Sequence, residues 1–145
     1  MSQANKSFIR RMVEECIIKG NFGHIEELIG SDYVYNEPTV GEVRGQGGYK
    51  QLIMGYRTAF PDLQFSIDEQ IAEGDRVVTC WTATGTQNGE LFGIKPTGKR
   101  CTVQGILVSR IADGKVVEEH ESWDVHGMLR QLGAAPANIK LAVRL

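Results

Sequence analysis

The spacing of apolar residues changes near residue 62, and this change limits the possible folds more than any other feature of the chain. Before it, apolar residues recur at helical spacing in three segments, residues 3–19, 21–30 and 47–60. After it, short β-branched and aromatic runs are separated by glycine-containing turns, as in antiparallel strands. Helices that precede a run of strands predict an α+β fold in which N-terminal helices cover one face of a curved, mostly antiparallel sheet.

The composition agrees with one domain over residues 1–145, since 41% of the residues are hydrophobic and 23% are charged. The formal net charge of -2, without a long basic run, argues against a nucleic acid or an acidic membrane as a partner. No apolar run reaches the roughly 18 residues of a membrane span, and the N-terminus lacks the apolar core of a signal peptide. We therefore expect a cytoplasmic protein.

The motifs that could bind a cofactor are incomplete. His24, His120 and His126 do not share the spacing of metal ligands, and the three cysteines are widely separated. The segment GIKPTGKR, residues 93–100, fits a phosphate-binding loop until Arg100 replaces the serine or threonine that would hold magnesium. The sequence predicts no metal and no other cofactor.

The segment KVVEEHESWD, residues 115–124, places Asp124 where a strand-like pattern gives way to a helix-like one. Alternate side chains of a strand share a face. One face is expected to carry Glu118, His120, Ser122 and Asp124, and the other Val117, Glu119, Glu121 and Trp123. Aspartate is both a favoured first residue for a helix and a usable proton-abstracting base, and both interpretations of Asp124 stay open.

The turn at Asp113-Gly114 decides which residues lie opposite this segment. A three-residue loop pairs Ile111 with Lys115, whereas a two-residue turn puts Val103 opposite Asp124. We favour the three-residue loop, because a type I turn followed by a left-handed glycine accepts the residues found here.

That loop predicts a mixed polar and apolar sheet face. It sets Gln104 across from Ser122 and Ile106 across from His120, on the same face as Asp124. Such a face is either the wall of a small-molecule pocket or a solvated surface.

Several short sequence motifs, spread over nearly the whole chain, resemble those of a known protein family. They are IEELIGSDYVYNEP at residues 25–38 and, further on, FPDL, GDRV, GELFGI, PTGK, DGKVVE and QLG. With them the chain resembles the SnoaL-like polyketide cyclase family, which implies the nuclear-transport-factor-two-like fold, a conical α+β barrel. The chain departs from that family at Asn36 and Gln87, where many relatives carry histidine, and at His120, a place that is often tryptophan.

The resemblance implies that Asp124 is the acid/base aspartate of the cyclases, which close a polyketide ring by aldol addition without a cofactor. We expect Asn36, Gln104 and His120 to be the hydrogen-bond donors or the acid, although each could instead have a structural role. The expected cavity wall for a small, hydrophobic, polyketide-like substrate consists of Tyr35, Phe60, Trp81 and Ile106.

Two alternatives of function stay open. The chain could be a non-catalytic small-molecule-binding or dimerisation module of the same fold, or could have a related isomerase, hydrolase or hydroxylase-like activity. The open sheet and the apolar segment IKLAVRL at residues 139–145 predict a homodimer or homotetramer.

Overall fold

The computed structural model describes residues 2–134, in which helices precede most of the strands. The helices are α1 (Ser2–Met12), α2 (Ile25–Leu28), α3 (Gly45–Ala59) and α4 (Val125–Gln131). The strands are β1 (Ile29–Glu37), β2 (Gly41–Arg44), β3 (Gln64–Glu73), β4 (Arg76–Thr86), β5 (Arg100–Ala112) and β6 (Lys115–Trp123).

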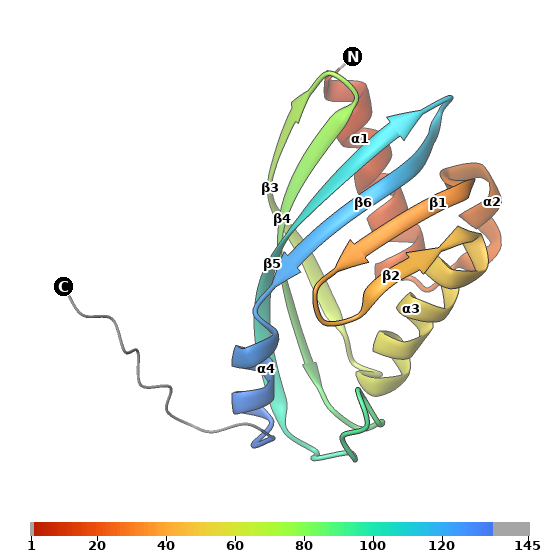
Figure 1. Ribbon diagram of the computed structural model, residues 1–145. Coiled ribbons are helices and arrows are strands. Elements are labelled where there is room, and N and C mark those ends of the chain that lie inside the picture. Colours follow the sequence, from red (N-terminus) through yellow and green to blue (C-terminus); the bar gives the residue numbers. More distant parts are fainter. Residues whose placement is uncertain (1, 135–145) are drawn as a thin grey trace.

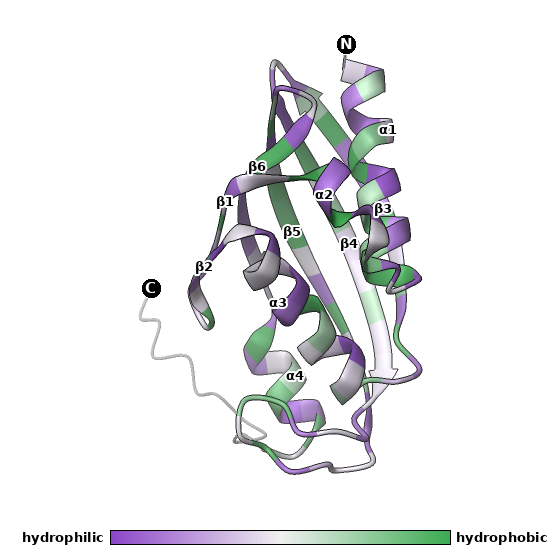
Figure 2. Ribbon diagram, turned by 90° about the vertical axis from the view of Figure 1, so that its right-hand side faces the viewer, coloured by the Kyte–Doolittle hydropathy of each residue, from purple (hydrophilic) through white to green (hydrophobic). Residues whose placement is uncertain are grey.

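The six strands form one curved sheet in the order β2-β1-β6-β5-β4-β3 (Figure 1). Neighbouring strands are antiparallel except β1 and β6, which run parallel. Helices α1 and α3 lie over the same face of the sheet, and α4 follows β6 at one end (Figure 2). The predicted α+β class, with N-terminal helices on a curved, mostly antiparallel sheet, is confirmed.

The first and third predicted helices are present with nearly the predicted bounds. The segment 3–19 forms α1 and a π-helical continuation, Val13–Ile18, and Gly20 follows with a φ of +67°. Glycine at a left-handed position is a common helix stop, as the sequence predicted. Helix α3 ends at Ala59, shortly before Pro61.

The second predicted helix is present but ends two residues earlier than predicted. The Asn21 side chain accepts a hydrogen bond from the Gly23 N–H, and a 3-10 turn, Phe22–His24, leads into α2. Helix α2 ends at Leu28, because the chain enters β1 at Ile29 and Gly30 lies inside this strand.

The hairpin of β1 and β2 lies between α2 and α3 and was not predicted. Tyr33, Tyr35 and Glu37 alternate as buried residues along β1. The Glu37 carboxylate accepts hydrogen bonds from the backbone N–H groups of Thr39 (2.9 Å) and Val40 (2.8 Å) and so holds the turn toward β2. The alternation in DYVYNE is a strand signal that the helical segments on either side obscured.

The predicted three-residue loop between β5 and β6 is wrong. Asp113 and Gly114 have φ values of 52° and 74°, and Ala112 pairs with Lys115 across them. Two positive φ values are required by the two-residue turn that suits the twist of a hairpin. Aspartate accepts this conformation better than most residues, and this tolerance decides the turn type.

Val117 is an extra residue in β6 and moves the register again. Ile111 pairs with Val116, whereas Arg110 pairs with Glu118. Beyond this bulge the pairs are Val108 with His120, Ile106 with Ser122, and Gly105 with Trp123. The Asp124 N–H donates to the Gln104 carbonyl oxygen at 3.2 Å, so neither predicted register holds at this end of the hairpin.

The main core lies between the helices and the inner face of the sheet. Its fully buried members include Ile9 and Met12 of α1, Leu28 of α2, Val77 of β4 and Val116 of β6. Within residues 2–134, no helix has both the length and the apolar character needed to cross a membrane. The predicted homodimer or homotetramer stays a prediction, and IKLAVRL lies outside the described residues.

Gln87 organises the long connection between β4 and β5 and is fully buried. Its Nε2 donates to the carbonyl oxygens of Gly89 and Ile94, both at 3.2 Å. Its Oε1 accepts from the Thr97 N–H at 3.2 Å and the Thr97 hydroxyl at 2.8 Å. One amide therefore holds three separate points of this connection.

We predict that Gln87→Leu lowers the free energy of unfolding by about 2–3 kcal/mol, because it leaves buried backbone groups without partners. Urea denaturation measures this loss, and Asn88→Ala, at the exposed neighbouring position, is the matched control. A Gln87→Leu variant as stable as the control would contradict the role of this amide.

Candidate active site

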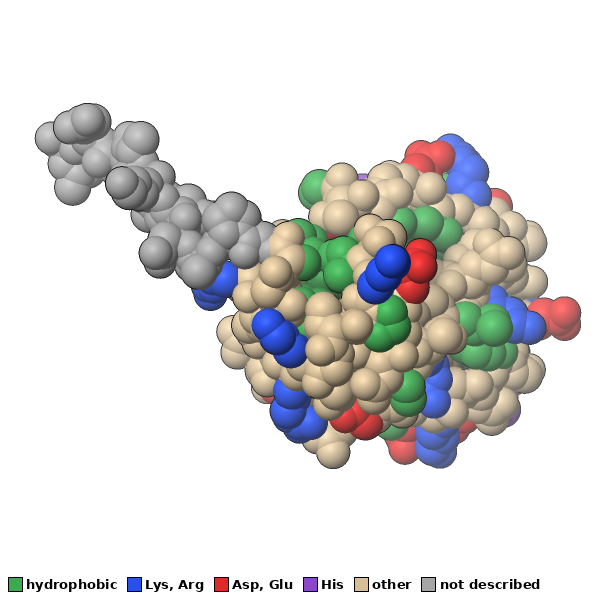
Figure 3. All heavy atoms as spheres, turned by 90° about the horizontal axis from the view of Figure 1, so that it is seen from below, with side chains coloured by type: hydrophobic (Ala, Val, Ile, Leu, Met, Phe, Trp, Pro, Cys, Tyr) green, Lys and Arg blue, Asp and Glu red, His purple; other side chains and the backbone are tan. Residues whose placement is uncertain are grey.

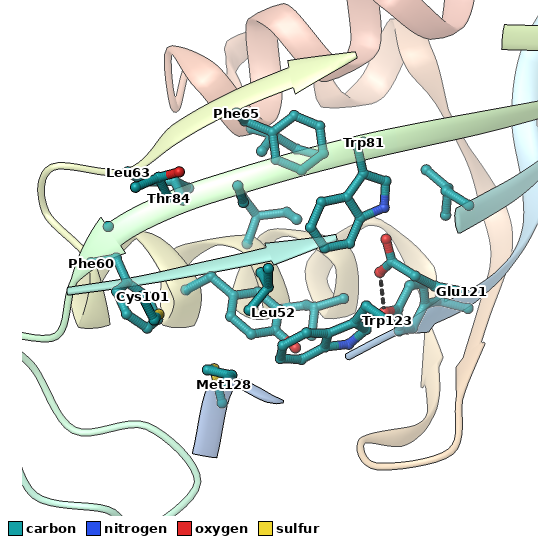
Figure 4. A pocket seen from close by; sticks show the side chains of 18 of the residues that line it. Leu52, Phe60, Leu63, Phe65, Trp81, Thr84, Cys101, Glu121, Trp123 and Met128 are labelled. Atoms are coloured by element: carbon teal, nitrogen blue, oxygen red, sulfur yellow. Dashed lines mark hydrogen bonds between the residues drawn. The ribbon is translucent and has the colours of Figure 1, made fainter. Parts of the chain in front are cut away.

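A cavity opens between α3 and the inner face of the sheet (Figure 4). It holds about 850 Å³ of space free of protein atoms, part of it open to solvent. Its apolar walls include Leu52 and Ile53 of α3, Phe65 of β3, Val103 of β5 and Met128 of α4. This lining suits a hydrophobic ligand, because small-molecule sites are lined mainly by apolar and aromatic side chains with a few polar groups.

Aromatic side chains shape the cavity. Phe65 and Trp81 stack with ring centres 5.0 Å apart, and Tyr56 meets Trp123 edge to face at 6.0 Å. Phe92 packs edge to face on the other side of Tyr56, at 6.2 Å, and is 44% exposed. Figure 3 shows from below the end where α4 and the β4–β5 connection lie, with several small groups of hydrophobic side chains among polar ones.

Two carboxyl groups from β6 enter this apolar space. Glu119 is 1% exposed, and Glu121 is half-buried, with part of its surface facing the cavity. The Tyr35 hydroxyl donates to Glu121 Oε1 at 2.6 Å (Figure 4). The two glutamates alternate along the strand beyond the Val117 bulge, and they therefore share the inner face.

Glu119 is held by two hydroxyl donors. The Tyr33 hydroxyl donates to its Oε1 at 2.7 Å, and the Ser109 hydroxyl donates to its Oε2 at 2.5 Å. Each donor comes from a strand next to β6 in the sheet, Tyr33 from β1 and Ser109 from β5. The carboxyl group is therefore fixed from both sides.

The surroundings shift the proton affinity of both carboxyl groups. Burial raises the pKa of Glu119 and of Glu121 from 4.5 to about 7, although hydrogen bonds from the neighbouring hydroxyls oppose the shift. Burial likewise raises the pKa of Tyr35, Tyr49 and Tyr56, which keeps these hydroxyls protonated. A carboxyl group with a pKa near neutrality can both accept and return a proton at physiological pH.

Three buried donors at the cavity have no hydrogen-bond partner in the part of the chain that the structure describes. They are the Tyr49 and Tyr56 hydroxyls and the Trp81 indole N–H. The indole nitrogen faces the Glu121 carboxyl group in Figure 4 without forming a hydrogen bond. The Tyr49 hydroxyl lies beside the Cys16 thiol and the Trp81 indole beside Glu121, whereas no acceptor of the described residues lies beside the Tyr56 hydroxyl. Because buried donors normally have partners, the Tyr56 hydroxyl best indicates a position for a ligand oxygen atom.

The structure brings together only part of the predicted site. Tyr35, Phe60 and Trp81 line the cavity as predicted. Gln104, Ile106 and His120 are exposed on the opposite face of the sheet, so the face that was predicted as a pocket wall is the solvated one. These residues do share one face, as predicted, because the observed pairing differs from the predicted one by two residues. The error lies in which of the two faces was taken as the inner one.

Asn36 and His120 do lie together, outside the cavity. They are partners in the parallel pairing of β1 and β6, and both border a shallow hollow with Glu37 and Glu42. Glu121 also borders this hollow and thus separates it from the cavity.

Asp124 caps the N-terminus of α4. Its Oδ1 accepts a hydrogen bond from the Gly127 N–H at 2.8 Å, its side chain is exposed, and it is absent from the cavity lining. The cap interpretation is therefore observed, and the role of Asp124 as a base stays a prediction.

Sequence reasoning missed Glu119 and Glu121, although it placed both on one face with Trp123. The polar residues on the other face were interpreted as the pocket wall. The large apolar side chain of Trp123 indicated which face points inward, because large apolar residues are usually buried. Within residues 2–134 no group of three or more His, Cys, Asp or Glu side chains could hold a metal ion.

Residues 7–132 match the SnoaL-like polyketide cyclase family. Among curated proteins, the nogalonic acid methyl ester cyclase of Streptomyces nogalater is 32% identical over 118 residues, covering 79% of this chain and 87% of the relative. The aklanonic acid methyl ester cyclase DnrD of Streptomyces peucetius is 30% identical over 132 residues, covering 86% and 88%.

A solved structure shows the same fold. AclR from Streptomyces galilaeus, described as a proposed hydroxylase, superimposes with a TM-score of 0.80 at 32% identity, covering 94% of this chain and 89% of AclR. Together with the family match, this similarity confirms the fold that the short motifs in the sequence predicted, except that the curved sheet is not closed into a barrel, since β2 and β3 are its two edges.

We predict that the folded chain loses stability as the pH rises from about 4.5 to about 7. Over this range the folded chain keeps protons on Glu119 and Glu121 that the unfolded chain has released, so the unfolded state binds fewer protons. The expected slope is up to about 1.4 kcal/mol per pH unit for the buried Glu119. Urea denaturation across this range measures it.

The double variant Glu119→Gln/Glu121→Gln should flatten this slope, because neither amide titrates. Glu118→Gln, on the opposite face of the same strand, should keep it. If the stability of the double variant depended on pH as strongly as that of the wild type, Glu119 and Glu121 would not be the groups that titrate in this range.

Proposed function

The chain belongs to the SnoaL-like polyketide cyclase family, and we propose that it closes a ring of a small polyketide by aldol-type addition, with Glu121 as the acid/base. Family membership confirms the prediction of a cyclase-type enzyme. The single observation that carries the mechanism is the Glu121 carboxyl group, which is surrounded by aromatic walls and faces the cavity. The methyl esters named for the two curated relatives suggest substrates to test.

Glu121 has the surroundings that a general base requires. Tyr35 donates to its Oε1 and fixes the orientation of the carboxyl group, and the Trp81 indole N–H lies beside the same carboxyl group. A pKa near 7 leaves a substantial fraction ionised at neutral pH, and this fraction can remove an acidic proton from carbon. Because the cavity is largely apolar, water competes little for that proton.

The proposed reaction is balanced without a cofactor. The Glu121 carboxylate removes a proton from a carbon atom between two carbonyl groups, and the resulting enolate carbon adds to a ketone carbonyl to form the carbon–carbon bond. The new alkoxide takes the proton back from Glu121, which returns to its starting state. No electron, proton or co-reactant remains to be supplied.

Unpartnered donors support the enolate step. The Tyr56 hydroxyl and the Trp81 indole N–H line the same cavity as Glu121 and lack partners in the free protein. Donors that are fixed before the reaction stabilise an oxyanion without the cost of reorientation. Tyr56 and Trp81 are therefore the proposed enolate donors.

We expect Glu121→Gln to lower kcat by about a hundredfold or more, because an amide cannot accept the proton, while glutamine can still bond to Tyr35. Turnover of aklanonic acid methyl ester, followed with the melting temperature, measures this effect. Glu118→Gln is the matched control, since Glu118 lies on the outer face of β6.

The same assay shows whether Glu121 or Asp124 is the base. Asp124→Asn keeps the cap of α4, because asparagine caps about as well as aspartate, and should therefore retain both stability and turnover. A stable Asp124→Asn variant that loses turnover, beside an active Glu121→Gln variant, would transfer the base role to Asp124.

Tyr56→Phe should lower kcat by about tenfold or more with little change in the melting temperature, because the hydroxyl has no partner to lose in the free protein. Steady-state kinetics on the same ester measures the effect. An unchanged kcat would remove Tyr56 from the donor set.

The non-catalytic binding module is the second candidate. Three unpartnered donors in an apolar cavity would also serve ligand binding alone. A wild-type chain that binds the methyl esters of both relatives and turns over neither would favour this function over the cyclase.

A further inference from the structure

The second carboxyl group of the cavity, Glu119, takes no part in the reaction proposed above. We propose that Glu119 is a specificity-determining residue that excludes negatively charged ligands from the cavity and so restricts it to neutral ones. This inference rests on the proposed use of the cavity for a small polyketide, and it concerns the choice of ligand rather than the chemical step.

The Glu119 carboxyl group lines the cavity and has no positively charged partner among the described residues. Both its oxygens accept hydrogen bonds, from Tyr33 and Ser109, and these neutral hydroxyls fix the group without neutralising it. It lies two residues from Glu121 on the same face of β6, roughly 7 Å along the strand. When both groups are ionised, the cavity wall carries two negative charges.

Among residues 2–134, no positive charge in the cavity wall offsets these two negative charges. None of the residues that line the cavity in the described part of the chain is a lysine, arginine or histidine. Arg57 of α3 donates instead to the carbonyl oxygens of Ile17 (2.7 Å) and Ile18 (2.8 Å). A ligand carboxylate in this cavity would therefore leave water without gaining a cationic partner.

The cavity nevertheless has polar positions for a ligand. The Tyr49 hydroxyl, on a side chain 2% exposed, and the Trp81 indole N–H, on a side chain 6% exposed, both line it without a partner. Ketone or ester oxygens can accept from such donors without bringing a charge. The donors thus favour oxygen-bearing ligands, and Glu119 selects the neutral ones among them.

Repulsion between like charges at this range is large in a mostly apolar site. With an effective dielectric constant between those of protein and water, one added negative charge costs on the order of tenfold or more in affinity. The burial of the ligand's own charge adds to this cost, and that part does not depend on Glu119. Removal of the Glu119 charge should therefore reduce, but not abolish, the preference of the cavity for neutral over negatively charged ligands.

The test compares anthraquinone-2-carboxylic acid with its methyl ester, two probes that differ in charge and share their ring system. The chain has two tryptophans, Trp81 and Trp123, and both line the cavity, so quenching of intrinsic fluorescence reports binding. At about pH 8.5 both the carboxylic acid and the cavity glutamates are ionised. The wild type should bind the ester on the order of thirtyfold more tightly than the acid.

Glu119→Gln should reduce this preference by about fivefold or more, because glutamine can keep the contacts to Tyr33 and Ser109 without the charge. Glu119→Asn is a second neutral variant, in case the first does not fold. Glu118→Gln, which removes a charge from the outer face of the same strand, should leave the preference unchanged.

Equal affinity of the wild type for the acid and the ester would overturn the proposal, as would an unchanged preference in the neutral variants. Failure of the ester to bind would also overturn it. These outcomes are read from binding alone, whereas the cyclase proposal is tested by turnover of Glu121→Gln. A cyclase that accepts both probes equally would refute the charge selection and leave the cyclase proposal intact.

Discussion

The extra residue Val117 in β6 decides which side chains reach the cavity, and the proposed site depends on it. The bulge follows a two-residue turn in which Asp113 and Gly114 both have positive φ. Beyond it, Glu119, Glu121 and Trp123 share the inner face, and His120 and Ser122 face solvent. A register shifted by one residue would reverse these faces, turn Glu119 and Glu121 outward and bring Glu118 and His120 inward.

Burial of two carboxyl groups in an apolar cavity is costly, and the neighbouring hydroxyls reduce the cost without removing it. Tyr33, Tyr35 and Ser109 each donate to one glutamate, and burial still raises both pKa values to about 7. The remaining donors, Tyr49, Tyr56 and Trp81, form no hydrogen bond within residues 2–134. The buried carboxyl groups and unpartnered donors therefore lower the stability of the fold, and some of the same groups are the ones that the proposed reaction uses.

Much of the fold could be predicted from the sequence, because helical spacing and glycine stops are local signals. Gly20 and Pro61 bounded two helices correctly, and Asp124 lies at the helix start where an N-cap was one of the two interpretations. Of the expected cavity wall, Tyr35, Phe60 and Trp81 do line the cavity, because large aromatic residues usually face the interior, and their role in binding a substrate stays a prediction. The carboxyl groups were missed because the strand pattern does not say which face is inward, and a bulge leaves no clear local signal.

The central claim is that two carboxyl groups in the cavity titrate near neutrality as a coupled pair. A titration of the glutamate side-chain carbons by carbon-13 NMR tests it most directly, with Glu119→Gln and Glu121→Gln used to assign the signals. The account predicts two signals with midpoints near pH 7, each lost in one variant. Glutamate signals that all titrate at or below about 4.5 would contradict it, because the cavity would then hold two ordinary carboxylates.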